Sequence, residues 1–379
     1  MRAPFLSSRL VWPKINPNHE NPLTRKDTMR VLIIKASALG DVIHALPVLD
    51  YLHQAHPGIE VDWVVEDRFS EILAGNPKLS AIHLVRTKLW RRHPFAGKTW
   101  QEITLLQQTL RERNYDLVFD IQGNLKSGLI CLLTGCADRI GFVREDLQES
   151  VNALCTTRRI PLRRQDYHIT DKYLRLASIP FAKDFRAMTL TSTIQTSPED
   201  DANAEALLVT LSDGLVFLFQ YGTTWQTKFW SETSWIALGR AVLDRFPDAS
   251  VLFPWGNEAE RSAVTSISLE IGQGSRVLDR FTLKGLTALL KRVDLVVGGD
   301  TGPVQLAAAV GTPTVSFYRA SDGKRSGPRG ERHVVIQSPM HCTRCFRTRC
   351  DKDAQCRDTI KVEAVLAGID QLLSQPGQK

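Results

Sequence analysis

Asp41 is the first residue of the chain whose type and position suit acid–base chemistry. It ends the segment Lys35-Ala-Ser-Ala-Leu-Gly-Asp41, which follows an apolar run and precedes a helical pattern. A carboxylate there can accept a proton from a hydroxyl group aimed at it. It can equally cap the helix that follows, because helix N-termini favour negative charge. The segment lacks the GxGxxG pattern, so the sequence has no dinucleotide-binding fingerprint at this point.

Two later segments carry the residue types that bind phosphate groups. Thr223, Thr224 and Lys228 offer two hydroxyls and one ammonium just before a predicted helix. In the segment 298–311, Asp300, Thr301 and Gly302 precede Pro303, and the free N–H groups of a helix start suit a pyrophosphate. The alternatives are a Thr-rich turn and a packing turn. Neither segment has P-loop spacing, which disfavours a nucleoside triphosphatase.

Two further groups of residues are candidates for binding. Lys126, in the segment Asp120–Ser127, either contacts an anionic substrate or belongs to a plain turn that Gly123 permits. Near the C-terminus, four cysteines have the spacing C-x2-C-x4-C-x5-C, namely Cys342, Cys345, Cys350 and Cys356. A structural zinc ion, an iron–sulfur centre and free thiols all fit this spacing. We expect a structural rather than a catalytic role.

The elements that position these residues alternate between strands and helices. Continuous apolar runs of strand length are typical of parallel strands buried on both faces. The predicted strands are Val31–Ile34, Val61–Val65 and Leu117–Ile121, and then Leu215–Phe219, Val251–Phe253, Leu295–Val297 and Thr314–Phe317. Helical spacing covers Val42–His53, Ser231–Phe246 and Val362–Leu373. We therefore predict an α/β fold with two Rossmann-like, doubly wound domains that face a cleft.

The same pattern predicts the domain boundaries. Residues 1–28 have no periodicity and form either a flexible extension or sequence upstream of the true start at Met29. We expect a first Rossmann-like domain at 29–190, a second at 205–360, and a C-terminal helix and tail at 361–379.

Charge and composition limit the function classes. The 379 residues include 48 basic and 41 acidic side chains, a net charge of +7, which favours an anionic partner. No apolar run reaches the roughly 18 residues of a membrane span. We found no secretory signal and expect a cytoplasmic protein. A basic nucleic-acid-binding protein is the non-enzyme alternative, but the interleaved aromatic and basic residues typical of such proteins are missing, so we expect no nucleic-acid partner.

Taken together, the ordered motifs resemble the ADP-heptose:lipopolysaccharide heptosyltransferases, glycosyltransferase family 9. The resemblance covers about residues 29–375 and rests on the segments 29–47, 115–127, 222–230, 254–256 and 300–313. It implies the GT-B fold, with an acceptor-side domain at 29–190 and a nucleotide-sugar-binding domain at 205–360. It also implies a metal-independent, inverting transfer of heptose from ADP-heptose to the Kdo residues or inner core of lipopolysaccharide. The segments 62–66, 86–92 and 254–256 look most like the heptosyltransferase I branch. A family relative with another nucleotide sugar or acceptor is the alternative.

The resemblance also implies roles for single residues. Asp41 would be the general base, and Thr223, Thr224 and Lys228 would lie at the ADP phosphates. Glu260 would match the acidic residue at the ribose, and Asp300, Thr301 and Gly302 would lie at the sugar and the pyrophosphate. No cofactor is expected for catalysis. Gln305 stands where the family usually has His, so a neutral amide would donate to the diphosphate in place of a cation.

The basic residues Arg86, Lys88, Arg91 and Arg92 follow a predicted strand of the first domain. Because Kdo-lipid A carries carboxylates and phosphates, we expect these four residues and Lys126 to bind the acceptor. The same charges are expected to hold the protein at the cytoplasmic face of the inner membrane.

Overall fold

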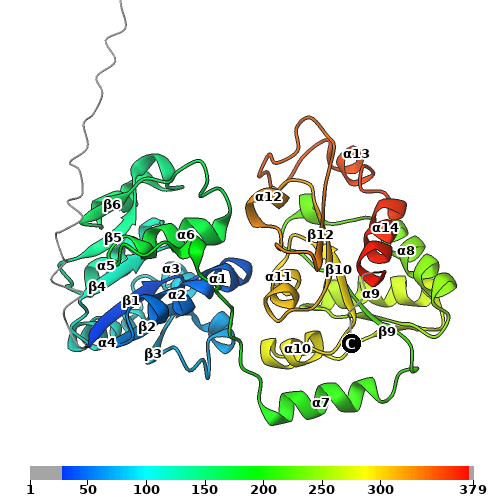
Figure 1. The fold of residues 1–379 in the computed structure, drawn as a ribbon, viewed down its shortest axis with the longest axis horizontal. Helices are drawn as coiled ribbons and strands as arrows, with labels where there is room; N and C mark the ends of the chain where they lie inside the picture. Colours follow the sequence, from blue (N-terminus) through cyan, green and yellow to red (C-terminus); the bar gives the residue numbers. More distant parts are fainter. Residues whose placement is uncertain (1–27, 375–379) are drawn as a thin grey trace, which may run out of the picture.

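The computed structural model describes residues 28–374, which form two parallel sheets flanked by helices (Figure 1). The predicted N-terminal extension lies outside the described residues, except for Thr28, as do residues 375–379. The α/β prediction is confirmed. The sequence analysis missed the four edge strands, whose partly exposed residues interrupt the apolar runs: β3 (Ala81–Val85), β6 (Arg158–Ile160), β9 (Ser275–Val277) and β12 (His333–Gln337).

The first sheet has six strands in the order β3-β2-β1-β4-β5-β6. Its strands are β1 (Met29–Ile34), β2 (Ile59–Glu66), β3 (Ala81–Val85), β4 (Leu117–Asp120), β5 (Arg139–Phe142) and β6 (Arg158–Ile160). The strand order reverses between β1 and β4, which pair in parallel with Ile34 opposite Asp120. The segments after these two strands therefore open at a topological switch point, where ligands bind in such sheets.

The helices of this half form one layer on each side of the sheet. Val31 and Ile33 pack against α1 (Leu39–Ala45), α2 (Pro47–Ala55) and α6 (Ile169–Ser178). Leu32 and Ile34 face the other layer, which contains α4 (Gly97–Glu112) and α5 (Leu125–Leu133), with α3 (Thr87–Arg92) before them. The short helices are η2 (Asp67–Ile72), η3 (Arg144–Asp146), η4 (Ser150–Leu154) and η5 (Phe185–Ala187).

The helix predicted over Val42–His53 is in fact two helices, and this prediction was wrong. Pro47 is the first residue of α2, and Leu46 is both the C-cap of α1 and the N-cap of α2. Proline lacks an N–H group and is tolerated in the first turn of a helix but not in its interior. The chain therefore stops α1 after Ala45 and restarts.

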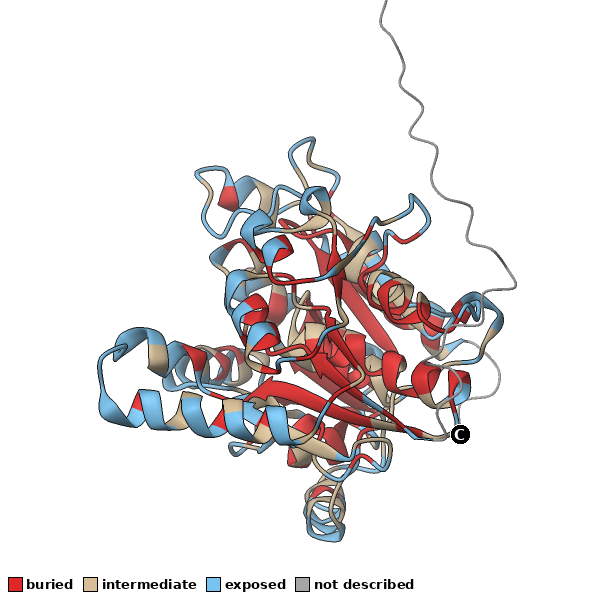
Figure 2. Ribbon diagram, turned by 90° about the vertical axis from the view of Figure 1, so that its left-hand side faces the viewer, coloured by how far each residue is buried: buried red, intermediate tan, exposed pale blue. Residues whose placement is uncertain are grey.

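The second sheet repeats the arrangement in the order β12-β11-β10-β7-β8-β9. Its strands are β7 (Val216–Gln220), β8 (Ser250–Phe253), β9 (Ser275–Val277), β10 (Leu295–Gly299), β11 (Thr314–Tyr318) and β12 (His333–Gln337). Its helices are α7 (Pro198–Leu208), η6 (Gln226–Lys228), α8 (Glu232–Arg245), α9 (Glu258–Ile271), α10 (Leu283–Leu290), α11 (Gly302–Ala309), α12 (Gly323–Ser326), α13 (Asp353–Arg357) and α14 (Val362–Leu373). Figure 2 shows the buried strands in red between helices whose outer faces are exposed.

The two halves touch where α1 meets α11. A Cβ atom at Gly302 would lie 2.6 Å from Leu39 Cδ2, so only glycine allows this approach. A second contact joins α6 to the segment around α12: the Tyr167 hydroxyl donates to Asp322 at 2.5 Å, and Arg329 forms a bidentate pair with Asp171 at 2.9 and 2.8 Å. These contacts bring the segments after β1 and β10 into one region.

Candidate active site between the two sheets

Asp41 lies in the first turn of α1, two residues from the contact between the halves. Its Oδ2 accepts a hydrogen bond from the backbone N–H of Ala38 at 3.2 Å, so the capping interaction exists. The side chain is nevertheless 42% exposed, and the Lys35 ammonium lies 3.7 Å from the same oxygen. Capping and a role as a base are therefore compatible in this geometry.

The electrostatic surroundings keep Asp41 ionised at neutral pH. Burial raises the pKa of Asp41, but the Lys35 ammonium, His44 and the Ala38 N–H together outweigh it and lower the pKa from its ordinary value. Burial lowers the pKa of Lys35, while Asp41 and Asp120 oppose that effect. A carboxylate that is ionised before the acceptor binds is the form that a general base needs.

Sequence analysis did not assign a role to Lys35, His44, Tyr173 or Arg325. The Lys35 ammonium lies 4.9 Å from the centre of the Tyr173 ring, and Arg325 of α12 acts electrostatically on Asp41. Burial lowers the pKa of His44 to about 4, although Asp41 and Asp300 both oppose this shift. Lys35 had one visible signal, since it is the charged residue that directly follows an apolar strand. His44 lies one turn after Asp41 in α1, whereas Tyr173 and Arg325 come from elements distant in the sequence.

Lys228 and Asp300 meet at the carboxyl ends of β7 and β10, where sequence analysis placed phosphate-binding segments. The Lys228 ammonium donates to Asp300 Oδ2 at 2.6 Å and lies 4.4 Å from the centre of the Trp225 ring. Thr223 and Thr224 lie on the loop between β7 and Lys228. The hydroxyl oxygen of Thr301, at the start of α11, is buried without a hydrogen-bond partner. A cation and a free buried hydroxyl therefore lie at the start of α11, and the loop that carries Thr223 and Thr224 leads to that cation.

Glu260 lies beside the same loop, although it belongs to α9. Its Oε2 accepts a hydrogen bond from the Gly256 N–H at 2.8 Å, and its Oε1 accepts one from the Asn257 amide at 2.8 Å. A Cβ atom at Gly222 would lie 2.3 Å from Glu260 Oε2, so the loop backbone is packed directly on the carboxylate. The structure thus brings Glu260 next to the residues that precede Thr223.

Gln305 is turned away from solvent, toward α12. It is 4% exposed, and its amide nitrogen donates to the Ser326 carbonyl at 2.7 Å and to the Tyr318 hydroxyl at 3.2 Å. Both amide hydrogens therefore have partners within the chain. The expected contact with a diphosphate stays a prediction, and binding would require at least one of these bonds to be exchanged.

The basic residues expected at the acceptor lie together at the edge of the first half. Arg86 is paired with Asp67 at 3.3 Å and Glu102 at 3.1 Å. Lys126 lies 3.5 Å from the Thr87 hydroxyl, which joins α5 to α3. The remaining three are exposed, and the part of the chain that the structure describes shows no ion pair for them: Lys88, Arg91 and Arg92.

The four C-terminal cysteines line one small pocket together with Arg319, Lys352 and Asp353. All seven cysteines are free thiols. Within residues 28–374, no three His, Cys, Asp or Glu side chains are arranged to hold a metal ion. Thiolates are ligands that zinc accepts, and the four cysteines line the same pocket, but the structure does not bring them into a coordinating group. A structural metal stays a prediction.

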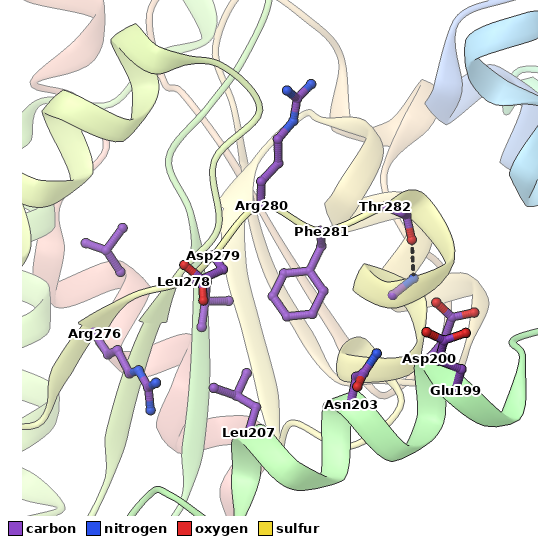
Figure 3. Close-up of a pocket in the computed structure, with 12 residues that line it drawn as sticks. Glu199, Asp200, Asn203, Leu207, Arg276, Leu278, Asp279, Arg280, Phe281 and Thr282 are labelled. Carbon is purple, nitrogen blue, oxygen red and sulfur yellow. Dashed lines mark hydrogen bonds between the residues drawn. The ribbon is translucent and has the colours of Figure 1, made fainter.

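A larger cavity, of about 640 Å³, lies between α7 and the segment that joins β9 to α10 (Figure 3). Asp200 and Asn203 line it from α7, and Arg280 and Phe281 from the other side. The predicted site residues do not line this cavity. No lysine lines it either, so it lacks a pair of a carboxylate and an ammonium like that of Asp41 and Lys35. The chemistry predicted from the sequence therefore lies elsewhere, at the contact between the halves.

Comparison with known proteins agrees with this geometry. The model of glycosyltransferase family 9 (heptosyltransferase) matches residues 103–355. The chain is 32% identical to lipopolysaccharide heptosyltransferase 1 of Pseudomonas aeruginosa, over 85% of this chain and 87% of the relative. It is 28% identical to the protein of the same name from Escherichia coli K12, over 82% and 94%.

Among solved structures, E. coli heptosyltransferase WaaC with ADP superimposes with a TM-score of 0.74 at 26% identity, over 91% of this chain and all of that one. E. coli heptosyltransferase II shares the fold with a TM-score of 0.71 at 19% identity, over 91% and 98%. No helix within residues 28–374 is long and apolar enough to cross a membrane. The two Rossmann-like halves, the ordered motifs and these similarities show that the chain belongs to glycosyltransferase family 9, the heptosyltransferases.

Proposed function

We propose that this glycosyltransferase moves heptose from ADP-L-glycero-β-D-manno-heptose to the Kdo or inner-core region of lipopolysaccharide, with inversion and without a metal ion. One observation carries the proposal. Asp41 of the first half and the Lys228–Asp300 pair of the second half lie on either side of the contact between Leu39 and Gly302. A base and a cation for the leaving group are therefore contributed by opposite sides of one site.

The reaction follows from these positions. The acceptor hydroxyl gives its proton to Asp41, its oxygen bonds to the anomeric carbon, and the bond from that carbon to the diphosphate breaks. Attack from the face opposite the departing ADP inverts the configuration. Lys228 and the free N–H groups of α11 supply positive charge to the diphosphate, so this reaction needs no metal ion. Thr223, Thr224 and Thr301 add hydroxyl donors, and Glu260 is placed for the ribose.

The acceptor is proposed to enter from the side of the first half. Arg86, Lys88, Arg91, Arg92 and Lys126 gather there, and guanidinium groups match carboxylates and phosphates. Kdo-lipid A has both groups. We place the protein at the cytoplasmic face of the inner membrane, where this lipid is assembled.

The decisive experiment is incubation with ADP-heptose and Kdo2-lipid A, with the product read by mass spectrometry. A mass increase of one heptose supports the proposal, and the Asp41→Asn variant is the matched control because it keeps the shape of the side chain. Competition by ADP, UDP and GDP tests the donor. Stronger inhibition by UDP or GDP than by ADP would instead favour a family relative with another nucleotide sugar.

A further inference from the structure

Exposed apolar side chains are concentrated in one part of the first half. Within residues 28–374, nine of the fifteen exposed large apolar residues lie between Leu89 and Leu154. Phe95 is 92% exposed, the highest value of the nine, and Trp100 is 57% exposed. Both lie at the corner between α3 and α4. An exposed apolar patch of this kind marks a surface that contacts a partner or a membrane.

The corner is ordered from inside and presents its apolar groups outward. The Trp90 N–H donates to Glu102 at 2.8 Å, and Arg86 donates to the same carboxylate at 3.1 Å. The Thr99 hydroxyl donates to the His93 carbonyl at 2.8 Å. Because these bonds tie α3 to the start of α4, Phe95 and Trp100 are exposed on an ordered surface.

Basic residues surround the apolar ones. We define the rim patch as Lys88, Leu89, Arg91, Arg92, Phe95, Lys98 and Trp100. Its four cations are exposed, and no ion pair is recorded for them within residues 28–374. The patch thus combines unpaired positive charge with aromatic side chains that point into solvent.

We propose that the rim patch docks on the surface of an anionic phospholipid bilayer, with Phe95 and Trp100 inserted at the headgroup level. This inference rests on the proposed function and names the surface that brings the protein to its lipid-linked acceptor. Aromatic rings are stable at the membrane interface, and each nearby Lys or Arg adds attraction to anionic lipids. The protein then lies on the membrane, consistent with the lack of a spanning helix among residues 28–374.

Charge distinguishes this occupant from a second copy of the chain. A twofold interface would place the same patch on both sides, so the four cations of each copy would face those of the other. An anionic bilayer instead complements them. The patch also overlaps the proposed acceptor entrance, because Lys88, Arg91 and Arg92 belong to both. Thr87 at the start of α3 contacts Lys126 of α5, the next residue of that entrance.

The test is sedimentation of the full chain with vesicles of phosphatidylcholine, with or without phosphatidylglycerol and free of lipopolysaccharide. We expect binding only to the anionic vesicles, and loss of it at high salt. Phe95→Ser with Trp100→Ser should lower the partition coefficient at least about tenfold, since two large apolar groups no longer insert. Lys98→Gln should lower it about fivefold. The matched control is Val209→Ser with Leu269→Ser, two side chains that are 85% and 77% exposed outside the patch.

Several results would overturn the proposal. The proposal is contradicted if the Phe95/Trp100 variant sediments with anionic vesicles as much as the wild-type protein does. It is also contradicted if the wild-type protein binds neutral and anionic vesicles equally. Light scattering that shows a dimer broken by these substitutions would assign the patch to self-association. Turnover with a detergent-dispersed acceptor should stay unchanged in the Phe95/Trp100 variant, and its loss would show a different role. If the wild-type protein binds vesicles but transfers no heptose, the proposed function fails and the membrane surface stands.

Discussion

Lys228 is the residue whose replacement should affect donor binding most directly. In the structure its side chain is 15% exposed, and its ammonium pairs with Asp300 at 2.6 Å. A diphosphate that binds at the start of α11 would replace or share this partner. A hydrogen bond to a charged group is worth about 1.5–3 kcal/mol. Lys228→Ala should therefore weaken ADP binding roughly 10- to 150-fold.

The pairing with Asp300 sharpens this prediction. In the free protein the Asp300 carboxylate pairs with the Lys228 ammonium. When ADP binds, the same carboxylate adds negative charge beside the diphosphate. Asp300→Asn should therefore preserve or tighten ADP binding, because the cation is released and the repulsion is removed. In the double variant the effect of Asp300→Asn on ADP affinity should shrink, since Lys228 is no longer there to be released.

Isothermal calorimetry with ADP and with adenosine measures these effects. Adenosine lacks the diphosphate, so its affinity should change little in Lys228→Ala. An equal loss for both ligands would show that Lys228 does not contact phosphate. Thermal unfolding of each variant without ligand separates a folding defect from a binding defect.

Four further predictions concern the remaining groups. Asp41→Asn should lower turnover about 10²- to 10⁴-fold with ADP affinity nearly intact, and near-wild-type turnover would refute its role as base. Lys35→Met should move the acidic limb of the kcat–pH profile to higher pH, because loss of the ammonium raises the pKa of Asp41. Gln305→Ala should lower kcat and ADP affinity while Gln305→His preserves kcat; unchanged kinetics with a lower melting temperature would leave Gln305 only its bonds to Ser326 and Tyr318. Replacement of Arg86, Lys88, Arg91 and Arg92 with Ser should raise the acceptor KM and flatten its salt dependence. A raised donor KM alone would reverse the assignment. If the Cys pocket binds zinc, purified protein should contain about one metal ion per chain, and chelation should lower the melting temperature; metal-free protein that melts unchanged after thiol alkylation contradicts a structural metal.

Local patterns were sufficient to predict the fold class and the general location of the site. An apolar run such as Val31–Ile34 is buried on both faces, and alternation with helices implies parallel strands. Within one such sheet the parallel strands end at the same edge, so the segments after β7 and β10 must meet there, whereas the segment after β1 belongs to the other sheet. Thus Lys228 and Asp300 could be assigned to one region from the sequence, and Asp41 was expected to face them across the cleft between two domains.

The partners of these side chains required the tertiary structure. Gln305 bonds to Ser326, which lies 21 residues further along the chain, and Lys228 pairs with Asp300 across 72 residues. Arg86, expected to be free for an acceptor, is paired with Asp67 and Glu102. No local periodicity encodes such pairs, because they depend on how elements pack.

The sequence by itself determined which residue types follow which strands, since hydrophobic periodicity and turn residues act over a few neighbouring positions. Only the tertiary structure decided which of those residues face one another. It brought Leu39 against Gly302, and with that contact it set the carboxylate of Asp41 opposite the start of α11. That choice depends on the close packing of two helices from different halves of the chain, where a single missing Cβ atom allows the approach.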